Sequence, residues 1–269
     1  MKIFTRGEIQ DLFTKAADPA LWTVVIPVAG KGTRLGYDKP KILYPIAGRT
    51  ILDRLVSLLE PYCGRFIFVF SPENALHVTP LLEEDARIAG RFEAPIIVGS
   101  RGMADSISQA LPLIDTPYTL IIWGDQVAIS KETIESVMRL HQFSQGAKLT
   151  LPLFQRENPY VHYEVDENGL LVRVLQKREG DTMPALGESD AGLFAVETQR
   201  LKEVYEQVVR DGFVPGNETG EWNFLPMLPL FVTTKEDMNG YRLDSFEETV
   251  GVNDSNDARL LEAYFHKCT

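Results

Sequence analysis

The sequence predicts an α/β fold in which a mixed, mostly parallel sheet is flanked by helices. Short apolar runs without polar alternation recur from residue 22 onward, as in strands that are covered on both faces. Stretches with helical periodicity separate these runs, and this alternation is typical of βαβ units. A chain of 269 residues is long enough to bury one large core.

The expected elements follow in chain order. Residues 1–20 are predicted to form a short helical extension, and residues 21–269 a single main domain. Buried strands are expected at Thr23 to Val28, Phe66 to Phe70, Pro95 to Val98 and Thr119 to Trp123. A helix is expected after Thr50, whose hydroxyl is suited to cap it. The apolar face of this helix consists of Ile51, Leu52, Leu55, Leu58 and Leu59.

The second half of the chain is less regular. Helices are expected at 130–143, 197–209 and 254–266. The runs Val161 to Val165 and Leu171 to Gln176 are separated by Asp-Glu-Asn-Gly, which is typical of a hairpin turn. A hairpin introduces antiparallel strands, so a mixed sheet is expected and not a wholly parallel one.

Composition excludes several classes of function. The formal charge of −11 argues against a nucleic-acid-binding surface, because phosphate backbones are held by basic patches. No segment reaches the ~18 consecutive apolar residues that a membrane span needs, and the first residues have no apolar run of signal-peptide length. We therefore expect a cytoplasmic protein. Cys63 and Cys268 lack metal-ligand spacing, so neither a disulfide framework nor a zinc site is expected.

The first predicted strand ends in a glycine loop, Val28-Ala-Gly-Lys-Gly-Thr-Arg-Leu-Gly36. Glycine allows close backbone approach to a ligand, and successive free N–H groups can hold phosphate oxygens. The segment 31–41 is also locally basic in an acidic chain. A Walker loop is excluded because Gly-Lys-Ser/Thr is missing. A dinucleotide fingerprint is excluded because Leu35 stands where its third glycine belongs, and Asp53 lies within a predicted helix.

Other motifs agree with a different family. Gly-x-Gly-Thr-Arg is followed by Lys39-Pro40-Lys41 and by Leu-x-Pro-x-x-Gly48. Here the chain resembles the sugar-1-phosphate nucleotidyltransferases, most closely the uridylyltransferase domain that makes UDP-N-acetylglucosamine. The resemblance covers residues 22 to 265. It implies a Rossmann-like nucleotidyltransferase domain at 21–269, without the C-terminal acyltransferase domain of those relatives.

The resemblance also implies an activity and a set of site residues. The activity is transfer of a nucleotidyl group from a nucleoside triphosphate to a sugar 1-phosphate, with release of pyrophosphate. Catalytic roles fall on Arg34, Lys41 and Asp125. Nucleotide-binding roles fall on Ala29, Gly30, Lys31, Gly32, Thr33 and Gly102.

Two oxygen ligands for Mg²⁺ are implied as well. Asp125 follows an apolar strand, at the end where open α/β sheets place their ligands. The family pairs this Gly-Asp with the asparagine of Gly-Val-Asn, which here is Asn253. Such a sparse pair suits Mg²⁺, which keeps several waters and takes other ligands from phosphates. Alternatively, Asp125 is a turn residue and Asn253 caps the last helix.

The middle of the chain departs from the family pattern. The glutamine that reads the pyrimidine base is replaced by Ile97, which leaves uridine, cytidine and thymidine open. On the acceptor side, a glutamate becomes Gln176 and an asparagine becomes Asp190. The acceptor-binding residues implied by position are His162, Gln176, Asp190 and Glu221.

Two other functions remain open. The first is a cytidylyltransferase that acts on a phosphorylated alcohol or a phosphonate. The second is a catalytically inactive, nucleotide-binding regulatory module. In either case the expected ligands are a nucleoside triphosphate and a small phosphorylated compound, with no nucleic acid and no membrane. The oligomeric state cannot be inferred from these patterns.

Overall fold

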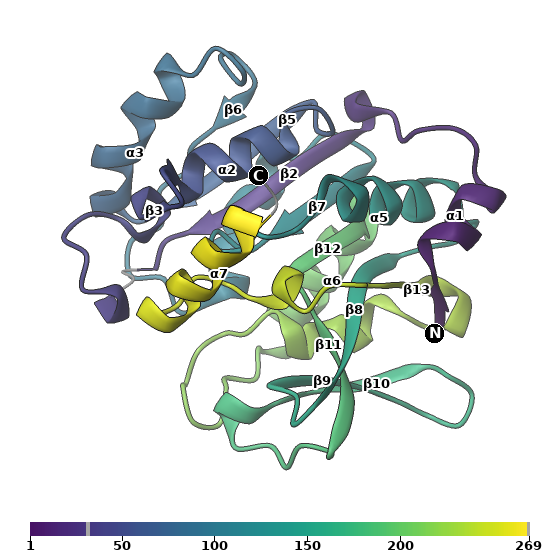
Figure 1. Cartoon of the computed structure of the whole chain (residues 1–269). Coiled ribbons are helices and arrows are strands. Elements are labelled where there is room, and N and C mark those ends of the chain that lie inside the picture. Colours follow the sequence, from purple (N-terminus) through teal and green to yellow (C-terminus); the bar gives the residue numbers. More distant parts are fainter. Residues whose placement is uncertain (31–32, 268–269) are drawn as a thin grey trace.

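The computed structural model describes residues 1–30 and 33–267. In this part of the chain, a nine-stranded mixed sheet lies between two layers of helices (Figure 1). The strand order is β1-β13-β8-β12-β7-β2-β5-β6, and β11 pairs with β8 beside this path. The strands are β1 (Lys2–Phe4), β2 (Trp22–Val28), β5 (Arg65–Phe70), β6 (Phe92–Glu93), β7 (Tyr118–Ile122), β8 (Leu149–Glu157), β11 (Leu186–Asp190), β12 (Leu193–Glu197) and β13 (Met238–Arg242).

The sheet is mixed and mostly parallel, which confirms the predicted fold class. β2 pairs in parallel with β5 and β7, and β13 pairs in parallel with β8 and β1. β12 is antiparallel to β7 and β8, so these two strands run in the same direction. The carboxyl ends of β2, β5 and β7 therefore meet at one edge of the sheet.

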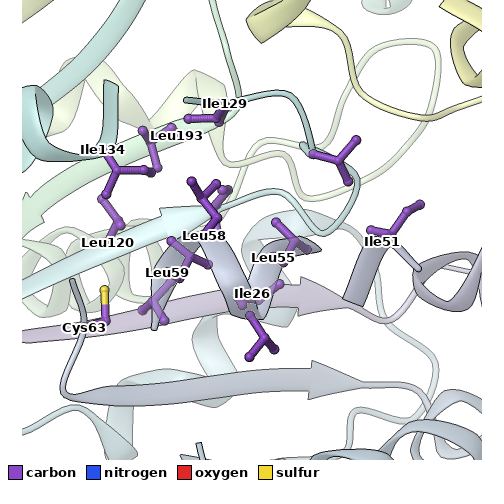
Figure 2. Close-up of a cluster of buried hydrophobic side chains, with 14 of the residues drawn as sticks. Ile26, Ile51, Leu55, Leu58, Leu59, Cys63, Leu120, Ile129, Ile134 and Leu193 are labelled. Atoms are coloured by element: carbon purple, nitrogen blue, oxygen red, sulfur yellow. The ribbon is translucent and has the colours of Figure 1, made fainter. Parts of the chain in front are cut away.

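Helices cover both faces because the strand side chains alternate. On β2, Val24 and Ile26 contribute to one hydrophobic core and Val25 to the other. The first core is covered by α2 (Ile51–Leu59), α3 (Pro72–Glu84), α5 (Lys131–Phe143) and α7 (Ser255–Lys267). The second is covered by α4 (Met103–Ala110), α6 (Thr198–Asp211) and η6 (Leu225–Phe231). Figure 2 shows Leu55, Leu58 and Leu59 of α2 packed over the strands of the first core.

The expected helix after Thr50 is confirmed, and the Thr50 hydroxyl accepts a hydrogen bond from the N–H of Asp53 at 3.1 Å. The other three helices agree with prediction to within two residues. The prediction of a strand at Pro95 to Val98 is wrong. The strand in this region is β6, which ends before Pro95, and Ile96 forms only an isolated bridge with Phe70. Pro95 has no N–H to donate, and the chain turns at Gly99, whose φ is +65°.

The N-terminal segment contains the expected helix, α1 (Arg6–Leu12), with a capping box between Thr5 and Glu8. It also contains β1, which joins the edge of the main sheet and is not predicted from the sequence. No helix of the described residues is long and apolar enough to cross a membrane.

A separate two-stranded sheet consists of β9 (Val161–Val165) and β10 (Leu171–Gln176), which confirms the predicted hairpin. Figure 1 shows it below the main sheet and next to β11. A smaller pair, β3 (Pro45–Ile46) and β4 (Arg49–Thr50), precedes α2.

Candidate active site

Predicted site residues gather at the carboxyl edge of the parallel strands. The glycine loop follows β2 and Asp125 follows β7, which is hydrogen-bonded directly to β2. This edge is where open α/β sheets bind their ligands. Two cavities of about 290 Å³ and 460 Å³ open at the amino edge and contain none of the predicted site residues. The candidate active site therefore lies among the side chains at the carboxyl edge and not in these cavities.

The glycine loop is described only in part. Lys31 and Gly32 lie outside the described residues. Ala29 is half-buried and Gly30 is exposed, and Thr33 begins a single 3-10 turn that ends at Leu35. Arg34 in this turn is exposed, and within the described part of the chain it forms no ion pair. Its guanidinium can therefore bind an anion without breaking a described contact.

Asn74, which the sequence analysis misses, fixes the backbone of this loop. Its side-chain amide donates to the carbonyl oxygens of Val28 at 2.5 Å and Gly30 at 3.3 Å. Asn74 is buried, in the first turn of α3 directly after β5. This buried amide joins the first turn of α3 to the glycine loop and restricts the motion of both. In the sequence, Ser71-Pro72 marks the start of a helix, but no local pattern indicates that Asn74 contacts the glycine loop.

Lys41 and Asp125 form an ion pair, 84 positions apart in the sequence, with 2.6 Å between Nζ and Oδ2. Lys41 begins the 3-10 helix η3 (Lys41–Leu43), and the two side chains are only 21% and 17% exposed. A partly buried pair is less screened by solvent than a surface pair. The ammonium has three donors and uses one on Asp125. It can therefore also donate to a phosphate oxygen.

The structure brings the Asn253 segment to Asp125. The Val252 N–H donates to the backbone oxygen of Asp125 at 3.0 Å. A Cβ on Gly251 would lie 3.0 Å from Asp125 Oδ1, so the absence of a side chain there leaves room for the carboxylate. The Asn253 amide nitrogen donates to the Gly251 carbonyl at 3.2 Å.

Asn253 is not the cap of α7. Asp254 fills that role, since its Oδ1 accepts from the N–H groups of Asn256 and Asp257. Among the described residues, Asn253 Oδ1 has no hydrogen-bond partner, and Asn253 is exposed. The segment that carries Asn253 thus lies against Asp125, and both side chains have oxygen atoms of the kind that Mg²⁺ prefers. No group of three His, Cys, Asp or Glu side chains in the described ranges is placed to bind a metal.

Gln126 is a second buried amide that the sequence analysis misses. It follows Asp125 and packs between Gly192 and Gly251, where Cβ atoms would lie 2.9 Å from Gln126 Cγ and 3.2 Å from Nε2. Its Oε1 is buried without a partner among the described residues. The two glycines therefore make room for this side chain.

On the predicted acceptor side, the segment that follows Asp190 contacts the segment that precedes Asp125. Trp123 donates from its N–H to the carbonyl of Gly192 at 2.9 Å. The Asp190 carboxylate accepts from the Gly192 N–H at 2.6 Å and from the Tyr163 hydroxyl at 3.0 Å. Burial raises the pKa of Asp190, although these two hydrogen bonds oppose the shift. The Tyr163 bond also ties the β9–β10 hairpin to β11.

His162 and Gln176 lie on neighbouring registers of the hairpin. Leu175 pairs with His162, and Gln176 pairs with Val161. His162 Nδ1 accepts from the Glu188 N–H at 3.1 Å, so this ring nitrogen is already occupied. Gln176 is buried, and its backbone N–H donates to Asp181 Oδ2 at 2.8 Å.

Glu221 lies beside the predicted nucleotide-binding Gly102. The Gly102 φ of +137° is a conformation that favours glycine, and a Cβ there would lie 2.6 Å from the Trp222 carbonyl and 3.0 Å from Glu221 Cβ. Glu221 forms an ion pair with Arg178 at 3.1 Å. Ile97, which replaces the base-reading glutamine, is buried in the second core. An apolar, buried side chain does not hydrogen-bond a pyrimidine.

Comparisons with known proteins identify relatives of the whole fold. The bifunctional proteins GlmU of Streptococcus gordonii and Brevibacillus brevis are each 25% identical to this chain, over 239 and 247 residues. The alignments cover 86% and 90% of this chain but 49% and 51% of those proteins. The chain thus spans about half the length of these curated relatives.

Solved structures share the fold. A putative glucose-1-phosphate thymidylyltransferase from Bacillus anthracis superposes with a TM-score of 0.72 at 12% identity, covering 90% of this chain and 94% of that one. HddC from Yersinia pseudotuberculosis gives a TM-score of 0.65 at 18% identity, covering 90% and 99%. A model of the MobA-like NTP transferase domain matches residues 24–190, more than half of the 269 positions. The chain belongs to the family of MobA-like NTP transferase domains.

Proposed function

We propose that this protein transfers a nucleotidyl group from a nucleoside triphosphate to a sugar 1-phosphate and releases pyrophosphate. The observation that carries the proposal is the Lys41–Asp125 pair, which the segment containing Asn253 joins at the carboxyl edge beside the glycine loop. A binding module has no need of this combination of cation, carboxylate and amide oxygen. Membership of the MobA-like NTP transferase family and the name of the thymidylyltransferase support the same class of reaction.

The chemistry requires placement of charge and no covalent intermediate. A phosphate monoester is largely ionised at neutral pH, so its oxygen attacks the α-phosphorus without a general base. Pyrophosphate leaves in line as the new P–O bond forms. Arg34 and Lys41 offset the negative charge that develops on the phosphates. Asp125 and Asn253 would hold Mg²⁺, which supplies further charge neutralisation when bound.

Backbone groups take over base recognition in this proposal. Since Ile97 is buried and apolar, base contacts fall to main-chain groups near Ala29 and Gly102. Asn74 holds the first of these backbone segments in place, and the Trp222 backbone packs against Gly102 in the second. On the acceptor side, the Asp190 carboxylate has lone pairs beyond its two described hydrogen bonds and can accept from a substrate hydroxyl.

The second candidate is a cytidylyltransferase for a phosphorylated alcohol or phosphonate that carries a cation. One observation favours it. Gly192 donates its N–H to the Asp190 carboxylate and packs directly against the indole ring of Trp123, so one glycine contacts both a carboxylate and an aromatic ring. Carboxylates and aromatic faces both bind ammonium groups.

One assay separates these functions. The protein with Mg²⁺ is mixed with UTP, CTP or dTTP and with sugar 1-phosphates or phosphocholine, and pyrophosphate release is measured. We expect release with a sugar 1-phosphate. Release with phosphocholine alone would establish the second candidate. If the triphosphates bind but no acceptor gives pyrophosphate, the protein is an inactive nucleotide-binding module.

A further inference from the structure

Residues 216–223, which we call the strap, connect the two sides of the candidate site. The strap follows α6 and carries Glu221 and Trp222. It contains one internal turn, in which Gly216 donates to the Glu221 carbonyl at 2.8 Å and Gly220 donates to the Gly216 carbonyl at 2.9 Å. Beyond this turn, it is held at two places by different parts of the fold.

The first anchor is the buried carboxylate of Glu179, which follows β10 in η5 (Lys177–Glu179). Its Oε2 accepts from the N–H groups of Glu218 at 3.1 Å and Thr219 at 3.2 Å. Its Oε1 accepts from the Thr219 hydroxyl at 2.7 Å and from the Asn223 amide at 2.9 Å. A Cβ on Gly216 would collide with this carboxylate. Four strap donors therefore converge on one side chain.

The charge of Glu179 is stabilised by these contacts. Burial alone would raise the pKa of Glu179, but the hydrogen bonds from Thr219, Glu218 and Asn223 outweigh it and lower the pKa. The adjacent Arg178 reaches the same part of the strap, with an ion pair to Glu221 at 3.1 Å and a hydrogen bond to Asn223 Oδ1. The β10 end of the acceptor side thus holds the strap through an ionised carboxylate.

The second anchor is the start of α4 on the nucleotide side. Trp222 donates from its N–H to the Arg101 carbonyl at 2.6 Å, and its own carbonyl accepts from the Ala104 N–H at 3.0 Å. These two bonds flank Gly102, which has no room for a Cβ against Trp222. The indole ring stacks on Phe213 with 5.1 Å between centroids. Asn223, bound to Glu179, is the next residue, so the two anchors are adjacent in the chain.

We propose that Glu179 is a positioning residue that couples acceptor binding to nucleotide binding through the strap. The identities of the two ligands, a nucleoside triphosphate and a sugar 1-phosphate, rest on the proposed function. Ligand contacts with the hairpin shift the Glu179 anchor, and the strap passes that shift through Trp222 to Gly102. If the Glu179 carboxylate is lost, some of the four hydrogen-bond donors of the strap have no partner, and the strap no longer keeps one fixed conformation. By linkage, the coupling acts equally in both directions.

The test is calorimetric titration with α,β-methylene UTP and α,β-methylene CTP, analogues that bind but cannot transfer a nucleotidyl group. Each titration is run with and without N-acetylglucosamine 1-phosphate, glucose 1-phosphate or phosphocholine. We expect one acceptor to tighten analogue binding by about fivefold or more, within the usual range of coupling. Glu179→Gln should weaken analogue binding by about tenfold and abolish the acceptor effect.

The chain offers a matched control in Asp237, which also holds a loop with four hydrogen bonds. They come from the N–H and hydroxyl groups of Thr233 and Thr234, at the amino edge just before β13. Asp237→Asn should also destabilise the fold, by less because Asp237 is only half-buried, but leave analogue affinity and coupling unchanged. Equal effects of Asp237→Asn and Glu179→Gln on analogue affinity would overturn the proposal, because stability would then explain both.

A milder variant keeps the proposal testable if Glu179→Gln does not fold. Thr219→Val removes one hydroxyl from the Glu179 anchor at nearly constant volume, and should reduce coupling in the same direction by a smaller factor. If Thr219→Val and Glu179→Gln both retain full coupling, the strap does not transmit it. Binding of the analogues does not require turnover. A protein that binds them without releasing pyrophosphate from natural substrates would contradict the proposed function but still test Glu179.

Discussion

The two sides of the candidate site are built from different kinds of backbone. The nucleotide side rests on the carboxyl ends of β2 and β7, in the centre of a sheet that is covered on both faces. The acceptor side is assembled from a two-stranded hairpin, β11 and the strap. Its polar side chains are mostly bonded to one another, as in the pairs Tyr163–Asp190 and Glu179–Asn223. Under the proposed function, phosphate binding would thus depend on the central sheet, and acceptor choice on hydrogen-bonded loops that few substitutions can change.

The largest expected effect concerns the sheet edge. Asp125→Ala and Asn253→Ala should each lower turnover by about 10² to 10³, the usual cost of losing one charge-stabilising group. Turnover with Mg²⁺ and in excess chelator is the measurement, and full activity in chelator would refute the metal assignment. Asp254→Ala is the matched control. It removes the α7 cap, at about 1 kcal/mol of stability, and should change turnover far less.

A second test on the same side separates binding from catalysis. Lys41→Ala should lower turnover by about 10² while weakening triphosphate binding less, because a charge matched to the transition state acts mainly on the barrier. Arg34→Ala should weaken both. Lys39→Ala, an exposed lysine two positions away, is the control and should change neither. If titration shows that Lys41→Ala only abolishes triphosphate binding, Lys41 is a ground-state anchor.

Substitutions at Asp190 and Gln176 should change acceptor specificity. We expect the native protein to discriminate against N-acetylglucosamine 1-phosphate, because a carboxylate accepts hydrogen bonds but donates none. A substrate acceptor group that faces Asp190 stays unpaired, at roughly 1 to 3 kcal/mol or about tenfold to hundredfold in rate. The double variant Gln176→Glu, Asp190→Asn should relieve this penalty. Unchanged acceptor preference in the variant would show that these residues do not set specificity.

The smallest effect is on stability at acidic pH. The folded state lowers the pKa of Glu179 below its ordinary value of 4.5, so the carboxylate contributes stability that is complete above that value. This contribution is lost as the pH falls through the folded-state pKa. Thermal unfolding between neutral and acidic pH should therefore show a shallower decline in Glu179→Gln than in the native chain. A parallel decline in both proteins would mean that Glu179 titrates normally.

The sequence predicts elements with a periodic apolar pattern better than short edge segments, for a physical reason. Buried strands and amphipathic helices have periodic patterns, so β2, β7 and α2 could be located from apolar residues alone. The strand expected at Pro95 to Val98 does not form, because Pro95 has no N–H to donate and the chain turns at Gly99. Edge strand β1 was missed since three residues are too few for a pattern.

Contacts between distant segments leave no local signal. Asn74, Gln126 and Glu179 act through bonds to loops that lie far away in the chain or through glycines that make room for them. A polar residue of this kind resembles any surface residue in the sequence. Only the fold shows that it is buried and what it contacts.

The Lys41–Asp125 pair has a further consequence for how fast a polyanion enters the site. The chain carries a formal charge of −11, so its long-range field repels a triphosphate. A bare carboxylate at the sheet edge would add to that repulsion at short range, but Lys41 neutralises it at 2.6 Å before any ligand arrives. Added salt screens the distant charges over about 8 to 10 Å and leaves this close pair largely intact. Association of the triphosphate should therefore become faster as ionic strength rises, the reverse of what a basic phosphate-binding surface produces.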